Sequence, residues 1–184
     1  MSLSSRIFIV YLLFVALCSY FVLRTVMDEI RPGVRQSTEE TLVDTANLLA
    51  EFLREPLVEN QLQSTRIRGI LRAYGHRQPN ASIWGVNKQA VNHRIYVTDD
   101  RGIVLLDSSG IAVGQDYSRW NDVYLTLQGK YGARSTSENE SDKSSSVMYV
   151  AAPITNNGKV IGVVSVAKPN SSVQPFIDRT HSRL

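Results

Sequence analysis

The chain begins with its most apolar segment. Residues Ile7 to Leu23 form a run of 17 uncharged residues between Arg6 and Arg24, which is roughly 25 Å long as a helix. With the flanking arginines reaching toward the interface, this length is just enough to span a bilayer. The run exceeds the apolar core of about 7–15 residues that is typical of a cleaved signal peptide, and Ala16-Leu17-Cys18 is a poor cleavage site. We therefore expect an uncleaved transmembrane anchor, with a cleaved signal as the alternative.

The orientation of this span does not follow from charge, because basic and acidic residues are mixed after it. The short N-terminal tail is easily kept inside, whereas about 160 following residues form a domain that translocates regardless of charge. We expect a cytoplasmic tail at 1–6, a transmembrane helix at 7–24, a periplasmic domain at 25–172 and a C-terminal helix at 173–184.

The next stretch has a helical pattern. Apolar positions recur at steps of three and four from Asp28 to Leu53, which predicts one long amphipathic helix. Pro32 marks a restart or kink near its start, and Pro56 is expected to end it. The apolar stripe suits packing on a sheet or pairing with a second copy; we favour the sheet, because a heptad repeat is not sustained. A second, shorter helix is predicted at 60–74.

From residue 94 onward the pattern changes to that of strands. Asp100-Arg101-Gly102 is a hairpin turn signal between two apolar runs. The segment 137–146 is polar and is expected to be an exposed, mobile loop. The predicted elements are strands at 94–99 and 103–108, a short helix at 117–128, a strand at 131–137, and two long strands on either side of an Asn-Asn-Gly-Lys turn at 156–159.

The last two strands are apolar on both faces. Along the first, Val147 and Tyr149 alternate with Met148 and Val150, and the partner strand has the same character. A sheet with a solvated side would show one polar face, so both faces must be covered. We expect an α+β fold, in which a transmembrane helix continues into a long helix packed on an antiparallel sheet of about five strands, with residues 110–130 covering the other face.

The amino-acid composition and charge disfavour several classes of function. The chain has 43% hydrophobic and 20% charged residues, as in ordinary globular proteins. Its net charge of +3 comes from scattered Lys and Arg, which gives nucleic-acid binding little support. The single cysteine, Cys18, excludes an intrachain disulfide and a cysteine metal site. His76, His93 and His181 have no common spacing, and no nucleophile elbow or phosphate loop occurs, so we expect no metal, no cofactor and no catalytic residue.

One segment concentrates groups that recognise ligands. Between Gly114 and Ser135 the chain places aromatic rings and guanidinium groups within about twenty residues. Arginine forks bind carboxylate or phosphate, while Trp and Tyr give apolar walls with polar tips. Arg134 stands out, because it alternates with Ala133 and Ser135 beside an apolar strand. The alternative is that the rings pack a helix on the sheet and the arginines are solvated. The candidates here are Arg119, Trp120, Tyr124, Tyr131 and Arg134.

Several long motifs carry a resemblance to a known family. IYVTDDRGIVLLDSS, GQDYSRW, GKYGARS, VMYVAAPI and VIGVVSVAKP resemble an extracytoplasmic single Cache (PAS-like) sensor domain. Together with RPGVRQSTEETLVDTANLLAE, they are similar to the sensor region of membrane histidine kinases of carbon-source-responsive two-component systems. The resemblance covers nearly the whole chain, from Ile7 to Arg179.

The resemblance implies a longer parent protein and a ligand site. Past Leu184 it implies a second membrane helix, a HAMP-like linker and a kinase core that phosphorylates a response regulator, so we expect no enzymatic activity from these 184 residues. In relatives of this fold that bind dicarboxylates, positive and hydroxyl side chains on the central sheet hold the ligand. By analogy this implies Arg119, Arg134, Tyr149 and Lys168 as ligand-binding residues.

We therefore expect a periplasmic sensor module at the inner membrane, acting as a homodimer. It would detect a small, in particular anionic, ligand or a periplasmic partner and relay the signal to a kinase core through the membrane helices. One alternative is a membrane-anchored interaction or dimerisation module without a ligand. Another is an anchored periplasmic enzyme, which the lack of a catalytic constellation disfavours.

Overall fold

The computed structural model describes residues 3–83, 85–137 and 146–169. The chain divides into two units, residues 1–40 and residues 41–184. Helix α1 (Leu3–Val58) contributes to both. In the first unit, Leu3–Thr25 has a mean hydropathy of 2.3 and is, by length and composition, able to cross a membrane. This segment contains the predicted span.

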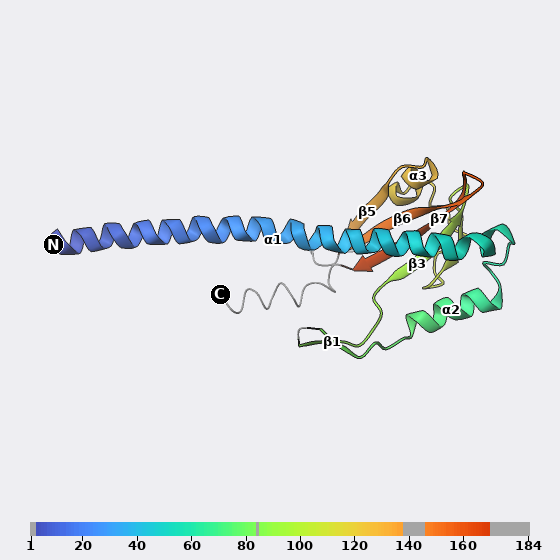
Figure 1. Ribbon diagram of the computed structural model, residues 1–184, viewed down its shortest axis with the longest axis horizontal. Coiled ribbons are helices and arrows are strands. Elements are labelled where there is room, and N and C mark those ends of the chain that lie inside the picture. The colour runs from blue at the N-terminus through green and yellow to red at the C-terminus, as the bar shows by residue number, and fades with distance from the viewer. Residues whose placement is uncertain (1–2, 84, 138–145, 170–184) are drawn as a thin grey trace. The chain divides into compact units, whose positions relative to one another are not determined.

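The second unit is built on a five-stranded antiparallel sheet with the strand order β4-β3-β7-β6-β5 (Figure 1). All four contacts between neighbouring strands are antiparallel, as predicted. A separate two-stranded sheet consists of β1 and β2. The strands are β1 (Ala81–Ile83), β2 (Val86–Lys88), β3 (Arg94–Asp99), β4 (Val104–Asp107), β5 (Gly132–Ser137), β6 (Ser146–Asn156) and β7 (Lys159–Pro169). The two further helices are α2 (Thr65–Gly75) and α3 (Asn121–Leu127).

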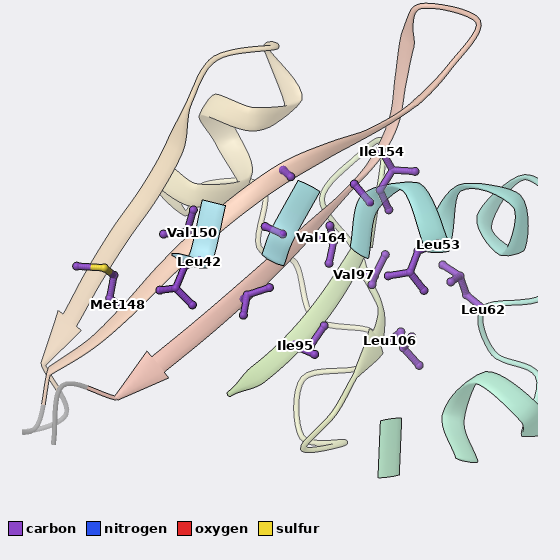
Figure 2. Packing of buried hydrophobic residues seen from close by; sticks show 14 residues of the cluster. Leu42, Leu53, Leu62, Ile95, Val97, Leu106, Met148, Val150, Ile154 and Val164 are labelled. Atoms are coloured by element: carbon purple, nitrogen blue, oxygen red, sulfur yellow. The ribbon is translucent and has the colours of Figure 1, made fainter. Parts of the chain in front are cut away.

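One face of the sheet packs against residues 41–58 of α1. Leu42, Ala46 and Leu53 from this helix are buried together with strand residues such as Val150 and Val164. Figure 2 shows Leu42 and Leu53 over this face, with Leu62 and Leu106 at one end of the cluster. Burying these aliphatic side chains supplies most of the free energy that holds helix and sheet together, at about 25 cal/mol per Å² of apolar surface.

The other face carries a second apolar cluster. Tyr96, Tyr149 and Ala167 from the strands are buried with Val123 from α3 and Tyr117 from the preceding loop. Each of these strand residues is one position away from a residue of the first cluster, which is the alternation of a pleated strand. The prediction that residues 110–130 cover this face is confirmed.

The hairpin turns follow from local chemistry. Asn157 and Gly158 have φ values of 50° and 76° between β6 and β7, the positive values that a two-residue hairpin turn needs. In the β3–β4 turn, Asp99 accepts hydrogen bonds from the backbone N–H groups of Arg101 and Ile103 at 2.9 and 2.8 Å. Gly102 in this turn has a φ of 88°, and both predicted turns are therefore present.

Three predicted helix boundaries were wrong, and one hairpin was missed. The helix expected at 117–128 starts only at Asn121, because Trp120 before it is extended with a ψ of 131°. Helix α1 continues through Pro56 to Val58, so this proline does not end the helix although it lacks a backbone N–H donor. The second helix starts at Thr65 rather than at Asn60, because Asn60 adopts a positive φ of 56° that no helix interior allows. The hairpin of β1 and β2 was not predicted at all. The helix expected at 173–184 and most of the loop expected at 137–146 lie outside the described residues.

An ion pair fastens the outer edge of the sheet. Arg94 on β3 donates hydrogen bonds from Nε and Nη2 to the two oxygens of Asp107 on β4 at 3.1 and 2.9 Å. The Asp107 carboxylate also accepts from Ser109 and from the backbone N–H of Ala112. Burial alone would raise the pKa of Asp107, but these hydrogen bonds outweigh it and lower the pKa to about 2.

We predict that Asp107 stabilises the domain in a pH-dependent way. Because its folded pKa lies below the unfolded value, the stabilisation is complete above about pH 4 and is lost as the pH falls toward 2. Asp107→Asn should lower the free energy of unfolding at pH 7 by about 1–3 kcal/mol, with a smaller difference at pH 2.5. Urea unfolding in detergent, followed by near-ultraviolet circular dichroism, measures both values. Asp100→Asn, in an exposed turn, is the matched control; an equal cost of Asp107→Asn at both pH values would refute the role of charge.

Candidate functional site

A buried carboxylate lies at the centre of the second apolar cluster. Asp122, on α3, has a fully buried side chain. One of its oxygens, Oδ2, accepts hydrogen bonds from the hydroxyls of Tyr96 on β3 and Ser165 on β7, the latter at 3.0 Å. The other oxygen accepts from Nε of Arg134 on β5 at 2.9 Å. One aspartate thus joins three strands to the helix that covers them.

The sheet register explains why these groups meet. Tyr96 pairs with Ser165 across β3 and β7, and Arg134 pairs with Tyr149 across β5 and β6. Tyr149 in turn pairs with Ala167 of β7. Directly paired residues point to the same face of a sheet, so the side chains of four strands converge beneath α3.

Aromatic rings enclose the Arg134 guanidinium. Its central carbon lies 3.9 Å from the ring centre of Trp120 and 3.8 Å from the ring centre of Tyr149. Trp120 also stacks on Tyr117 with ring centres 3.7 Å apart, and Tyr117 meets Tyr96 edge to face at 5.2 Å. Cation–π contacts of this kind are strongest where water is excluded, which is the case for a side chain that is only 15% exposed.

The electrostatics of the cluster favour the ionised pair. Burial opposes the charge of Arg134, but the attraction and hydrogen bond of Asp122 more than offset this, and the pKa of Arg134 is raised. Burial, followed by the Asp122 charge, raises the pKa of Tyr96 as well, so its hydroxyl remains a hydrogen-bond donor. The arrangement therefore holds a charged guanidinium and a hydroxyl that donates a hydrogen bond.

One nitrogen of the Arg134 guanidinium makes no hydrogen bond to the described residues. Nε is bonded to Asp122 and Nη1 to the hydroxyl of Thr136. Nη2 is buried and has no hydrogen-bond partner among the described residues, and the same holds for the hydroxyl of Thr126 on α3. A buried donor without a partner costs about 1–3 kcal/mol, so an acceptor placed there would relieve that cost.

The residues predicted from the sequence divide into three groups. Arg134, Trp120 and Tyr149 are brought together, as just described. Arg119, Tyr124 and Tyr131 are exposed residues of the same region, the two tyrosines by 50% and 54%. Lys168 lies apart from the cluster, because it pairs with Met148 of the first apolar cluster and therefore points to the opposite face. Burial, and then the charge of Lys88, lower the pKa of Lys168.

Sequence reasoning missed three members of the cluster: Tyr96, Asp122 and Ser165. Asp122 resembled an ordinary acid in the first turn of a helix, and Tyr96 an ordinary residue of an apolar strand. Ser165 was the available signal, because it is a polar residue inside the buried run GVVSVA and a buried hydroxyl requires a partner.

We predict that the Asp122–Arg134 pair behaves as a coupled unit. Asp122→Asn should lower the free energy of unfolding by about 3–5 kcal/mol, because it leaves the Arg134 charge buried without a counterion. Combining it with Arg134→Met removes both charges and should restore most of that loss. Urea unfolding of both single variants and the double variant measures the coupling. If the double variant lost as much as the two single variants summed, the ion pair would not be the cause.

Known proteins place this geometry in context. No family model matches the chain. It is 48% identical over all 184 residues to the Sensor protein CreC of Escherichia coli (strain K12), and it spans 39% of that protein. The similarity covers the apolar span as well as the sheet domain.

Solved structures with low sequence identity share the fold. The sensor domain of the V. cholerae histidine kinase DctB superposes with a TM-score of 0.53 at 16% identity, over 83% of this chain and 59% of that chain. The ligand-binding domain of the Campylobacter jejuni chemoreceptor Tlp3, in complex with 4-methylisoleucine, gives 0.51 at 18%, over 82% and 57%. The predicted resemblance to a Cache (PAS-like) sensor domain is thereby confirmed at the level of the fold, and the chain is similar along its entire length to part of the sensor protein CreC.

Proposed function

We propose that the chain is the periplasmic sensing region, with its first membrane anchor, of a two-component sensor histidine kinase in the bacterial inner membrane. The observation that carries this proposal is the 48% identity to CreC across both the apolar span and the domain. The chain spans 39% of that relative, so the kinase activity and phosphorylation of a response regulator of the CreB type belong to the proposed parent protein.

The proposed ligand site is the cluster around Arg134. The unpartnered Nη2 supplies a donor for an anionic ligand, and Trp120 and Tyr149 supply the walls. Arg119, Tyr124 and Tyr131 are the exposed residues of the same region. Because two aromatic rings already contact the guanidinium, we expect ligand binding to require them to rearrange.

This rearrangement would produce the signal. In one state Asp122 holds Arg134, α3 and the sheet together; in the other a ligand shares the guanidinium. A ligand shifts the populations by its difference in affinity for the two states. The sheet packs on residues 41–58 of α1, and α1 also contains the candidate span, so a shift of the sheet on this helix acts on the anchor.

Dimerisation through α1 is a second part of the proposal. Leu48 and Phe52 lie one turn apart on this helix and are 59% and 71% exposed. Large apolar side chains one turn apart on a helix are typical of a seam with a second helix. The same feature supports the alternative of an interaction module without a ligand.

We predict that an anion stabilises the domain through Arg134. A ligand at 100 times its Kd should contribute about 2.7 kcal/mol, which raises the melting temperature by several degrees. We would screen carboxylates, phosphates and cell-wall fragments by thermal shift on the full chain in detergent. Arg134→Lys keeps the charge that balances Asp122 but loses the fork, and should weaken any hit at least tenfold. Arg101→Gln, in the exposed β3–β4 turn, is the control; unaltered binding by Arg134→Lys would exclude this site.

We also predict a parallel α1 contact between two copies. In a Cys18→Ser background, Phe52→Cys should form a disulfide-linked dimer under mild oxidation in detergent or membranes. Arg54→Cys is the matched control, because two residues further along a helix is about 200° around its axis. Non-reducing electrophoresis measures the dimer fraction. Equal crosslinking at both positions would indicate random collision and would contradict the seam.

A further inference from the structure

A second concave site lies away from the Arg134 cluster. It is a cleft of about 370 Å³ between α2 and the segment formed by β4 and the loop that follows it. This volume is within the range of about 300–1,000 Å³ that is usual for small-molecule sites. None of the residues that line it belongs to the Asp122 cluster, and α2 takes no part in that cluster.

The packing of α2 leaves two arginines at the cleft. Ile67, Leu71 and Tyr74 form the side of α2 that packs on the first apolar cluster. Arg68 directly follows Ile67 in the sequence, and Arg72 directly follows Leu71. Both arginines line the cleft. Residues four apart on a helix have their Cβ atoms about 5–6 Å from each other, so both guanidinium groups reach a single bound molecule.

Part of the lining of the cleft is apolar. Leu71 from α2 and Leu105 and Leu106 from β4 line it, and Leu106 is only 2% exposed. Ser108 and Ser109 add hydroxyl groups at the β4 side. Apolar side chains together with a few convergent polar groups are usual in a site for a small organic molecule.

The positive charges of Arg68 and Arg72 are not neutralised by an acidic side chain in the cleft. Within the part of the chain that the structure describes, neither Arg68 nor Arg72 forms an ion pair, and both are exposed. Asp107 is the carboxylate among the lining residues. Its side chain is fully buried, and its oxygens are occupied by Arg94, Ser109 and the Ala112 N–H. The charge of Asp107 is therefore already paired with Arg94. The positive charges of Arg68 and Arg72 remain at the cleft.

We propose that this cleft binds a small dianion with an apolar body, such as an organic phosphate or dicarboxylate. Arg68 and Arg72 hold the charged end through their forks, and Leu71 and Leu105 contact the apolar part. Two guanidinium groups match a double negative charge better than a single one. This site is additional to the one proposed at Arg134 and does not depend on it.

Binding there would also fix α2. None of the described residues of α2 is fully buried, so this helix is held by partly buried contacts alone. A ligand that bridges α2 to the β4 loop adds contacts on its other side. Its backbone amides should then exchange hydrogen more slowly with solvent, because local opening becomes less frequent.

Titration calorimetry of the full chain in detergent tests the proposal with phenyl phosphate as the probe. Inorganic phosphate carries the charge without the apolar body, and benzyl alcohol carries the body without the charge; both should bind at least tenfold more weakly. Arg68→Gln and Arg72→Gln should each weaken phenyl phosphate at least tenfold, since Gln preserves helix propensity while removing the charge. Hydrogen exchange of residues 65–75 should slow on adding the probe.

Arg66→Gln is the matched control, because Arg66 is exposed on the same helix but does not line the cleft. It should leave the affinity of the cleft for phenyl phosphate unchanged. Equal losses in Arg66→Gln and Arg68→Gln would mean non-specific attraction, and loss in Arg134→Lys alone would place the probe at the other site. Either result, or no binding at 10 mM probe, overturns the proposal. A failure at this cleft leaves the Arg134 proposal standing, because that proposal is tested by its own variant.

Discussion

The whole domain depends on the β6–β7 hairpin being apolar on both faces. Neither face of such a hairpin can be exposed to solvent, because each apolar face needs a layer packed on it that excludes water. Residues 41–58 of α1 cover one face, and α3 with the preceding loop covers the other. The two covers differ in chemistry: the first contact is aliphatic throughout, whereas the second contains a buried ion pair and a set of stacked rings. That difference supports our proposal that the α3 layer recognises the ligand and that the α1 layer supports the sheet.

Much of the fold could be predicted because it follows from periodicity. Alternation along the last two strands separates Tyr149 from Val150 and assigns each to the correct face. Helix ends were less predictable, because both Pro56 and Asn60 are residues that can end a helix. The backbone geometry shows that α1 ends at Val58, just before Asn60 with its positive φ. Arg134 was identifiable as an arginine in an otherwise small-residue strand. Its counterion was not, because Asp122 is 12 residues away from Arg134 and 43 from Ser165 along the chain. Contacts at such separations require the strand register, which a single sequence does not define.

A buried ion pair is a poor source of stability but a suitable element for a switch. Well-packed apolar residues in its place are often as stable or more so, whereas breaking the pair on one side is costly. Asp122 draws hydrogen bonds from β3, β5 and β7, so its environment changes only if α3 and three strands move together. In the switch that we propose, this connectivity would favour a response in two states over a gradual one. In this arrangement the Nη2 of Arg134 remains a buried donor without a hydrogen-bond partner among the described residues.

The two candidate sites act on different parts of the same sheet. The Arg134 cluster ties α3 to β5, the edge strand at one side. The cleft beside Arg68 and Arg72 adjoins β4, the edge strand at the opposite side. Between them lie β3, β7 and β6, which share both apolar clusters with α1 and α3. A close-packed sheet transmits displacement rather than absorbing it, so any influence of a ligand at one edge on the affinity at the other edge would pass through these three strands. By linkage that influence must be reciprocal, so a molecule held at one edge reports on the occupancy of the other.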